Sequence, residues 1–561
     1  MTEDLRQPSP DAGAAQSDAG AAQSPNTPRG ASREVAQQPL AWTLFALTLL
    51  VYLVTAKGFS DLNDAEAYYL VTKALVERGA VDVEPELTEP STKLYFEGPD
   101  GKLYAHFGIG FPLFAAPLYV IGQVGGWALE ALSPRLAGVS DIFPRVAVTL
   151  GCALVAAGSV ALLYLLLLRL GLGPVWAVST ALMYAFTTYV WAYSKIGFYD
   201  IHLVFFEVSA LLAAVLYRQT RHLGWCLLSG FSLAWGTATR PTLGLALPIL
   251  TVYLAWAGWR HWQDAAQAQE RKLPEASRAR ALWALLKPAV VFGLGMVPWL
   301  LIVLWYNSLR TGVTGDFGYP GTDFIPTRRI LSFLKAVYGN SVSPGRGFFV
   351  YSPTVLLMFW GIGPLWRRWR AESLVLWPLA LLTAAFFCAR PGWETVWPWG
   401  PRYLLVLTPL VMLPVGFALP VLWARRSGRA LVLTLLAVAL VIQILSIVVP
   451  FGTFLHYVKQ VAGSPRVAAL NLHYIPILGQ VHTLERVRFD RVPLKALRGG
   501  YVARDMKMNL RHSLDFWFIY AYRLGVPAAL WVPPLLLLLA ATGLTARRLQ
   551  RQVARLEPGG G

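Results

Sequence analysis

Residues 143–168 read FPRVAVTLGCALVAAGSVALLYLLLL, an apolar run with one charged side chain. A helix needs about 20 apolar residues to cross a bilayer, so this run predicts a transmembrane helix. With 55% hydrophobic and 14% charged residues, the chain has a composition suited to lipid as its main solvent. The sequence therefore predicts an all-α integral membrane protein with about 12 transmembrane helices. The other runs of this character are residues 40–57, 175–193, 201–217, 223–239, 241–258, 288–306, 347–366, 374–389, 402–423, 430–449 and 526–545.

A further apolar stretch, residues 107–132, contains prolines and glycines that interrupt a helix. If this stretch does not cross the bilayer, every short basic cluster falls on the same side as Arg29 and Arg33, as the positive-inside rule requires. We therefore expect a juxtamembrane or re-entrant helix there, both termini in the cytoplasm, and an inner-membrane location. The clusters are Arg218/Arg221, 259–287, Arg367/Arg368/Arg370, Arg425/Arg426/Arg429 and 547–555.

Most of the polar sequence then faces the periplasm, which predicts that the protein works on that side. The exception to the charge rule is 450–525, which holds eleven Lys or Arg against four Asp or Glu. Long segments translocate regardless of charge, so this segment does not reverse the topology. It is predicted to form a small outer domain or surface helices near an acceptor entrance. Its charge suits an anionic glycan or glycolipid, or equally an anionic lipid surface.

The formal charge of +18 does not indicate nucleic-acid binding, because the basic residues lie in short clusters between apolar runs. Cys152, Cys226 and Cys388 have no paired spacing, so the sequence supports neither a disulfide framework nor a zinc site. Residues 1–38 are rich in Ala, Gly, Ser, Pro and Gln, which predicts a disordered cytoplasmic tail. The expected parts are that tail, a membrane module over 39–449, the segment 450–525, and a last helix with a basic tail over 526–561.

The first outer loop, 58–142, begins with GFSDLNDAEAYYLVTKALVERG at 58–79. Acidic residues near its start and Gly79 at its end predict a helix, whose apolar face would lie on the membrane surface. Asp64 and Tyr68 are four residues apart and share a face of that helix. The helix N-terminus favours the ionised form of Asp64, which a general base requires. The alternative is that these acids only cap the helix.

The order of several segments resembles the C-type glycosyltransferase superfamily (GT-C), which includes protein O-mannosyltransferases and bacterial aminoarabinose transferases. Its members are similar in placing acidic residues just outside the first span, then a surface helix, then a Gly/Pro-rich juxtamembrane segment. The likeness covers roughly residues 40–450. Its segments are the 58–79 loop, GKLYAHFGIGFPLFAAPLYVIG at 101–122, WAYSKIGFYDIHLVFF at 191–206, GNSVSPGRGFFVYSP at 339–353 and WPWGPRYLLVLTPL at 397–410.

This resemblance implies a GT-C-like membrane glycosyltransferase that uses a polyprenyl-phosphate-linked sugar and inverts the anomeric carbon on the periplasmic face. The acceptors known in such families are proteins, glycolipids and polysaccharides. Asp64 is the expected general base. This chain departs from the family by having Asp64-Ala65-Glu66 instead of adjacent acids, and Glu66 is kept as a further catalytic candidate.

Asp200 stands where the resembling family carries a second outer carboxylate. It is a candidate to orient the acceptor or to bind a divalent metal together with Asp64 and His202, and the alternative is a helix cap. No cofactor other than such a metal is expected. His106 is a candidate phosphate or metal contact, or it makes a local hydrogen bond only.

Basic residues are needed to receive a departing phosphate, and Arg240, Arg346 and Arg402 are the candidates. Arg240 lies in a short outer loop, where the charge rule disfavours arginine. Arg346 is flanked by glycines that permit close approach, and Arg402 follows three nearby tryptophans. Tyr68 and His106 complete the donor-site candidates. The alternative for Arg346 and Arg402 is membrane anchoring.

Two other classes of protein are alternatives to a glycosyltransferase. A transporter or flippase of lipid-linked sugars would have inverted repeats and charged groups near mid-membrane. No internal repeat is visible, but Glu207 lies within the span 201–217 and keeps this alternative open. A structural membrane protein would leave the outer carboxylates and arginines without a role.

Overall fold

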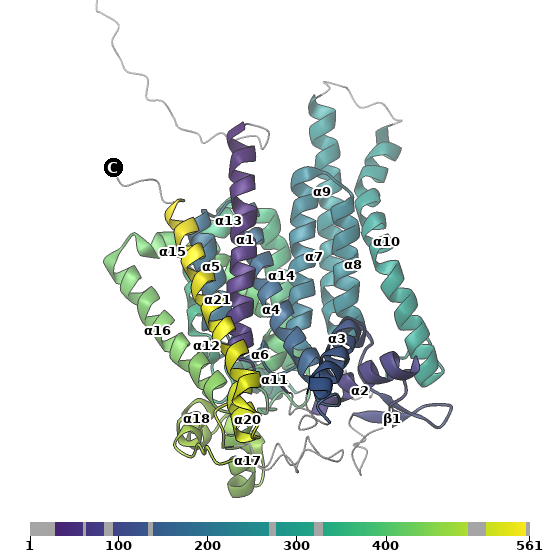
Figure 1. The fold of residues 1–561 in the computed structure, drawn as a ribbon. Helices are drawn as coiled ribbons and strands as arrows, with labels where there is room; N and C mark the ends of the chain where they lie inside the picture. Colours follow the sequence, from purple (N-terminus) through teal and green to yellow (C-terminus); the bar gives the residue numbers. More distant parts are fainter. Residues whose placement is uncertain are drawn as a thin grey trace, which may run out of the picture.

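The protein is described from a computed structural model that covers residues 28–59, 63–83, 94–132, 138–268, 277–318, 329–491 and 512–556. Helices make up nearly all of its regular structure, as predicted, and the chain is a multi-pass membrane protein. Its long helices run side by side (Figure 1). These are α1 (Pro28–Val54), α4 (Phe143–Arg169), α5 (Pro174–Thr187), α7 (Asp200–Thr220), α8 (Gly224–Thr239), α9 (Ala246–Ala268), α10 (Ser277–Thr311), α13 (Met358–Arg368), α14 (Arg370–Ala389), α15 (Leu407–Trp423), α16 (Arg426–Val448) and α21 (Ala528–Ala554).

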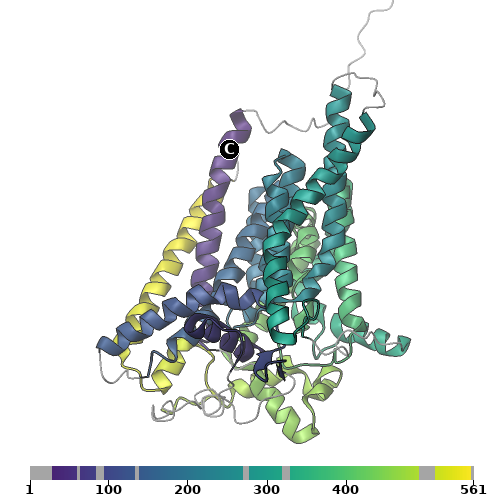
Figure 2. The ribbon, with the colours of Figure 1, turned by 90° about the vertical axis from the view of Figure 1, so that its right-hand side faces the viewer.

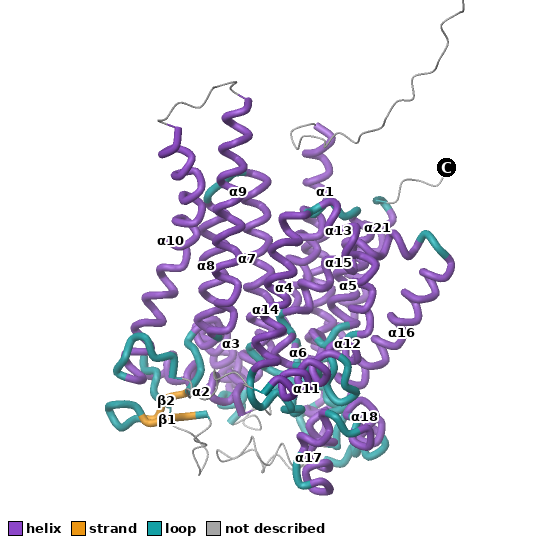
Figure 3. The backbone as a smooth tube through the Cα atoms, turned by 180° about the vertical axis from the view of Figure 1, so that it is seen from behind, coloured by secondary structure: helices purple, strands orange, loops and turns teal. Residues whose placement is uncertain are grey.

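Most of the remaining elements gather at one end of the bundle, the lower end in Figures 1 and 3. The helices are α2 (Asn63–Arg78), α3 (Gly110–Leu132), α6 (Val190–Tyr193), α11 (Ile330–Ser341), α12 (Phe348–Tyr351), α17 (Phe451–Ala462), α18 (Pro476–Leu484) and α20 (Trp517–Arg523). The 3₁₀ turns are η2 (Pro241–Leu245), η4 (Pro353–Leu357), η5 (Arg402–Leu404), η6 (Pro465–Ala469) and η7 (Leu472–Tyr474). Strands β1 (Tyr95–Glu97) and β2 (Leu103–Ala105) form an antiparallel hairpin in which Tyr95 faces Ala105.

By length and composition, eight helices within the described residues can cross a membrane, and two shorter apolar helices accompany them. The predicted count of about 12 is therefore not confirmed. Several predicted spans are broken. The run 175–193 is split into α5 and α6 where Thr188 is extended, and 347–366 is split into α12, η4 and α13 around Pro353. Proline has no backbone N–H to continue a helix, which explains the second break.

Helix α3 occupies the stretch predicted to be juxtamembrane. Its length and composition alone would allow it to cross a membrane. In Figure 2, however, α3 runs across the lower end of the bundle beside α2 instead of along the bundle axis. Gly122 and Gly126 permit this packing, since a Cβ at either position would come within 3 Å of the backbone at Pro144 or Ser140. This orientation supports the juxtamembrane interpretation.

The two ends of the bundle differ in what they carry. Helix α1 begins, α9 ends, α10 begins and α21 ends at the upper end in Figure 1, whereas α2, α17, α18 and α20 lie at the lower end. The start of α1 at Pro28 extends helix into the predicted tail 1–38, and residues 1–27 lie outside the described part. Proline is well accepted in the first turn of a helix, where its missing N–H has no intrahelical partner in any case. Residues 492–511 of the outer segment 450–525 also lie outside the described part.

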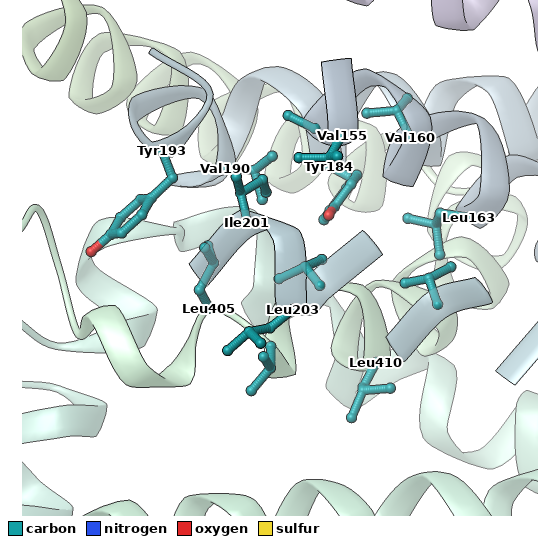
Figure 4. Close-up of a cluster of buried hydrophobic side chains, with 14 of the residues drawn as sticks. Val155, Val160, Leu163, Tyr184, Val190, Tyr193, Ile201, Leu203, Leu405 and Leu410 are labelled. Carbon is teal, nitrogen blue, oxygen red and sulfur yellow. The ribbon is translucent and has the colours of Figure 1, made fainter. Parts of the chain in front are cut away.

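The core lies between α4, α5, α6, α7 and the chain leading into α15. Figure 4 shows Val155, Tyr184 and Ile201 converging from three of these helices, with Leu405 and Leu410 close by. These five side chains are fully or almost fully buried. Helix α17 contributes Phe454, Leu455 and Val458 to a second, smaller apolar cluster, which they form with Val396, Ala468 and Ala469. The larger core supports the lower ends of α7 and α15, where the polar residues described below lie.

A buried ion cluster joins the start of α20 to the membrane module. Asp515 lies 2.9 Å from the Lys195 ammonium and 3.4 Å from the Lys57 ammonium, and all three side chains are buried. The Lys195 Nζ also donates to the carbonyl oxygens of Ile447 and Asp515. Lys195 lies in the short connection that leads to Asp200, so this cluster anchors the chain that places Asp200.

The acidity of Asp515 predicts a pH effect on stability. Burial opposes ionisation, but Lys195 and Lys57 outweigh it and lower the pKa of Asp515 from 3.8 to about 2. A carboxyl with a lowered folded-state pKa stabilises the fold above its unfolded pKa and loses that contribution as the pH falls through the folded pKa. We expect Asp515 to contribute about 2 kcal/mol at neutral pH and to lose it between about pH 4 and pH 2.

The measurement compares wild type with Asp515→Asn in detergent over this pH range. The difference in unfolding free energy should shrink as the pH falls, because protonation removes the same charge in wild type. A difference that stays constant down to pH 2 would show that Asp515 does not titrate in this way.

Candidate active site

One arginine bridges the two carboxylates that the sequence singled out. Asp64 is the second residue of α2, Asp200 is the first residue of α7, and Arg402 begins η5. The Arg402 Nη1 donates to Asp64 Oδ2 at 2.7 Å, and its Nε donates to Asp200 Oδ2 at 2.7 Å. Three segments separated by up to 338 residues therefore meet at one guanidinium.

A second arginine, Arg240, lies near the other carboxylate oxygen of Asp200. Arg240 directly follows α8, and its extended backbone ends the helix there. Its Nη1 lies 3.7 Å from Asp200 Oδ1 and donates to the Tyr199 hydroxyl at 2.6 Å. The Arg240 guanidinium also lies 4.5 Å from the centre of the Tyr403 ring. Asp200 is thus held between two cations.

The two carboxylates differ in their access to solvent. The Asp64 side chain is 30% exposed, whereas that of Asp200 is 4% exposed. Asp64 is therefore the carboxylate that an incoming group can reach, and Asp200 lies behind Arg402. Within the described residues, the Arg402 Nη2 is buried without a hydrogen-bond partner. A buried donor left unpaired costs free energy, so this position is suited to an acceptor oxygen supplied by a ligand.

Tyr403 and Arg390 are parts of this group that the sequence analysis missed. The Tyr403 ring centre lies 4.5 Å from the Arg240 guanidinium, 5.3 Å from that of Arg390 and 5.6 Å from that of Arg402. Three arginines against Asp64 and Asp200 leave one net positive charge. The sequence could have indicated Tyr403 by its position next to Arg402. It could have indicated Arg390 as a cation directly after an apolar span.

Tyr68 connects α2 to the end of α8. Its hydroxyl donates to the Thr239 carbonyl oxygen at 3.2 Å, which ties α2 to the end of α8 next to Arg240. Its ring stacks on Phe107 with centres 4.9 Å apart and contacts Tyr199 at 4.5 Å. These contacts position Asp64 one helical turn away, and they make Tyr68 a packing residue in this structure.

Glu66 has a different partner from its neighbour Asp64. It forms an ion pair with Arg145, whose guanidinium lies 4.1 Å from the centre of the Tyr69 ring. Residues two apart on a helix point in widely different directions, which explains why the two acids separate. The structure places Glu66 in the contact between α2 and α4, outside the group around Arg402.

The histidines do not assemble with the carboxylates. His106 Nδ1 is bonded to the carbonyl oxygen of Gly318, and its ring stacks on Phe96. His202 Nδ1 lies 3.2 Å from the Thr239 hydroxyl, and its ring contacts aromatic side chains that include Phe206. Among the described residues, no group of three His, Cys, Asp or Glu side chains can hold a metal ion. The proposed metal set of Asp64, Asp200 and His202 therefore has no support from this geometry.

Arg346 differs from the other arginine candidates. Its Nη1 donates to the carbonyl oxygens of Trp393 and Thr395, which shapes the 390–401 segment that leads to Arg402. Burial lowers the pKa of Arg346 to about 10. These carbonyls engage its Nη1, which places Arg346 beside the group around Arg402, while its Nε is buried without a hydrogen-bond partner among the described residues.

A comparison of the sequence with protein families gives a direct match to part of this region. Residues 124–267 match the family described as dolichyl-phosphate-mannose-protein mannosyltransferase. The predicted resemblance is confirmed over this segment. The matched GT-C-type segment contains Asp200, His202 and Arg240, and it does not reach Asp64 or Arg402. No curated protein sequence matches the chain.

Three solved structures are similar to the chain at low sequence identity. ArnT from Cupriavidus metallidurans bound to undecaprenyl phosphate is 16% identical, with a TM-score of 0.41 over 80% of this chain and 75% of that one. Apo ArnT is 15% identical, with a TM-score of 0.43 over 87% and 86%. The archaeal oligosaccharyltransferase AglB from Archaeoglobus fulgidus, in complex with an inhibitory peptide and a dolichol-phosphate, is 15% identical, with a TM-score of 0.40 over 80% and 56%.

Proposed function

We propose that this protein is a polyprenyl-phosphate-dependent membrane glycosyltransferase, which moves a sugar from a lipid-linked donor to an acceptor in the cell envelope. The observation that carries the proposal is the contact of Arg402 with both Asp64 and Asp200, with Arg240 on the far side of Asp200. With Arg390 on the Tyr403 ring, this group combines an accessible carboxylate with one net positive charge. The match of residues 124–267 to a mannosyltransferase family supports the same class of reaction.

Asp64 is assigned as the general base of an inverting transfer. The acceptor hydroxyl gives its proton to Asp64 as its oxygen attacks the anomeric carbon of the sugar. The bond between that carbon and the phosphate oxygen breaks, and its electron pair leaves with the polyprenyl phosphate. Attack opposite the leaving group inverts the anomeric carbon. The greater exposure of Asp64 supports its role in meeting the acceptor.

Arg402 and Arg240 are assigned to the departing phosphate. Negative charge grows on the phosphate as the bond breaks, and fixed guanidinium groups stabilise that charge without having to reorient. The unpartnered Nη2 of Arg402 is available to a phosphate oxygen. Asp200 is buried between both guanidiniums and acts as a positioning residue for them. No step in this scheme requires Glu66, His106 or His202.

The proposed orientation places this site at the periplasmic face of the inner membrane, with both termini in the cytoplasm. The positive-inside rule supports this orientation, because the Arg-rich turns lie at the opposite end of the bundle from Asp64. The acceptor is proposed to be a glycolipid, a polysaccharide or a protein of the envelope. Cysteine labelling of intact cells at position 64 tests the orientation, and access only from the cytoplasmic side would overturn it.

The test of function uses purified protein in vesicles with undecaprenyl-phosphate sugars labelled in the sugar. The donors should be a panel of hexoses and pentoses, and the acceptor should be an envelope extract. Transfer of label to an acceptor that depends on Asp64 supports the enzyme. Movement of intact labelled lipid across the bilayer without transfer supports the transporter alternative and overturns the proposal.

The assignment of Arg240 makes a prediction about donor binding. Replacing Arg240 with Gln removes a cation beside the phosphate and leaves the carboxylate of Asp200 with one arginine fewer. We expect lipid-donor binding to weaken by about 10- to 100-fold, the scale of one charged hydrogen bond, with acceptor binding changed much less. The measurement is the KM for each substrate in the transfer assay.

Arg221→Gln is the matched control for this variant. Arg221 is an exposed arginine at the opposite end of α7, paired with Asp264 across the surface. This control should leave both KM values unchanged. A larger loss of acceptor binding than of donor binding in Arg240→Gln would contradict the assigned role.

A further inference from the structure

Glu207 is a buried carboxyl that the scheme above does not use. It lies in α7, two turns beyond Asp200, and is 2% exposed. Its Oε2 has no hydrogen-bond partner within the described residues. A buried carboxyl oxygen without a partner in an apolar setting is costly, and polar groups inside membrane spans tend to have a functional partner.

A recess connects Glu207 to the group around Arg402. Asp200, Leu203 and Glu207 line it from one face of α7, as their spacing of three and four residues allows. Arg240, Arg402, Tyr403, Thr242 and Thr383 are its other polar lining residues. The remaining lining is apolar, from Leu243, Leu245, Ala246, Leu379, Phe387, Leu405 and Val406.

The size and lining of this recess limit what it can hold. Its volume of about 10 Å³ is room for a single water molecule in the structure as it stands. A larger ligand has to turn side chains aside, and rotamer changes of this kind are common on binding. A polyprenyl tail would gain nothing from Glu207 or the two threonines, since it has no hydrogen-bonding groups. A ligand with several hydroxyl groups would pair with all three side chains.

We infer that Glu207 is a specificity residue for the transferred sugar and accepts a hydrogen bond from a hydroxyl group on the side of the ring away from the phosphate. This inference rests on the proposed function. The seven residues from Asp200 to Glu207 rise by about 10 Å, so the two residues lie on one face of α7 about two turns apart. One sugar ring with its hydroxyl groups bridges such a gap.

The experiment compares binding of two lipids that differ only in the sugar. The probes are undecaprenyl phosphate and the undecaprenyl-phosphate sugar that serves best in the transfer assay, each titrated against wild type, Glu207→Leu and Glu207→Gln. For Glu207→Leu we expect the Kd of the sugar-bearing lipid to rise by about 10- to 100-fold, with the Kd of undecaprenyl phosphate unchanged. Glu207→Gln keeps an acceptor oxygen and the side-chain shape, so its loss should be smaller.

The control variant is Ser209→Ala, on the same helix. Ser209 bonds to Ser232 at 3.1 Å and is not among the residues that line the recess, so both Kd values should stay at the wild-type level. The thermal unfolding midpoint of each variant in detergent tests whether it is folded. If Glu207→Leu fails to fold, Glu207→Gln still tests the inference through its smaller rise in the Kd of the sugar-bearing lipid.

The outcomes separate this inference from the function on which it rests. Equal weakening of both lipids by Glu207→Leu would place Glu207 beside the phosphate or the tail and overturn the inference alone. Unchanged binding of both lipids in Glu207→Leu would also overturn it alone. If wild type binds neither lipid, the proposed function itself fails.

Discussion

Replacing Asp64 with asparagine is expected to lower the rate of sugar transfer by roughly 10²–10⁴-fold, the usual contribution of a general base. Asparagine has nearly the same shape and keeps an oxygen that can accept from Arg402, but it cannot take the proton of the acceptor hydroxyl. The loss should therefore fall on kcat, with the donor KM nearly unchanged. The measurement is steady-state transfer of label from an undecaprenyl-phosphate sugar.

Asp100→Asn is a matched control for the Asp64 variant. Asp100 is an exposed carboxylate in the same outer loop, where it accepts from the Tyr104 hydroxyl at 2.9 Å. The same chemical change there should leave transfer at the wild-type rate. A correctly folded Asp64→Asn protein with full turnover would remove Asp64 from the mechanism and leave Asp200 as the next carboxylate to test.

Replacing Asp515 with asparagine is expected to lower the free energy of unfolding by about 2–5 kcal/mol at neutral pH, the lower figure being the contribution of its lowered pKa and the upper figure the cost of breaking a buried ion pair. The substitution preserves the size of the side chain but leaves the ammonium groups of Lys57 and Lys195 buried without their shared counter-ion. A buried charge without a partner costs far more than an exposed pair gains. The measurement is a denaturant titration in mixed micelles followed by tryptophan fluorescence.

Asp264→Asn provides the comparison for this stability change. Asp264 pairs with Arg221 at 3.5 Å, and both side chains are about half exposed. Breaking such a surface pair should cost less than about 1 kcal/mol. An equally small change for Asp515→Asn would mean that the lysines find water or other partners, and that the cluster does not anchor α20.

Much of this architecture was predictable because it depends on hydropathy, which is summed over neighbouring residues of the chain. The apolar run 143–168 predicted α4 closely, since burial in lipid requires a continuous apolar length. Where the chain carries breaks, as around Thr188 and Pro353, hydropathy alone overestimated the length of single helices. These breaks are one reason why the described helices that are long enough do not reach the predicted count of about 12 spans.

The candidate site was likewise predictable only in part, and its residues show why. Asp64, Arg240 and Arg402 were selected from local context and Asp200 also from the family resemblance, and the structure brings these four together. Arg346 was selected on the same grounds but bonds to backbone carbonyls instead. Local sequence contains no information about which of two similar arginines will meet a carboxylate hundreds of residues away.

The sequence by itself determined that the chain is a helical membrane protein and which polar residues break the pattern of its surroundings. Hydropathy and charge are properties of short segments, so they can be read without knowing the fold. Only the tertiary structure decided that Arg402 joins Asp64 to Asp200, that Glu66 turns to Arg145, and that Glu207 faces the recess beside them. Ion pairs and cavities act over a few ångströms, and the packing of distant helices sets which groups come that close.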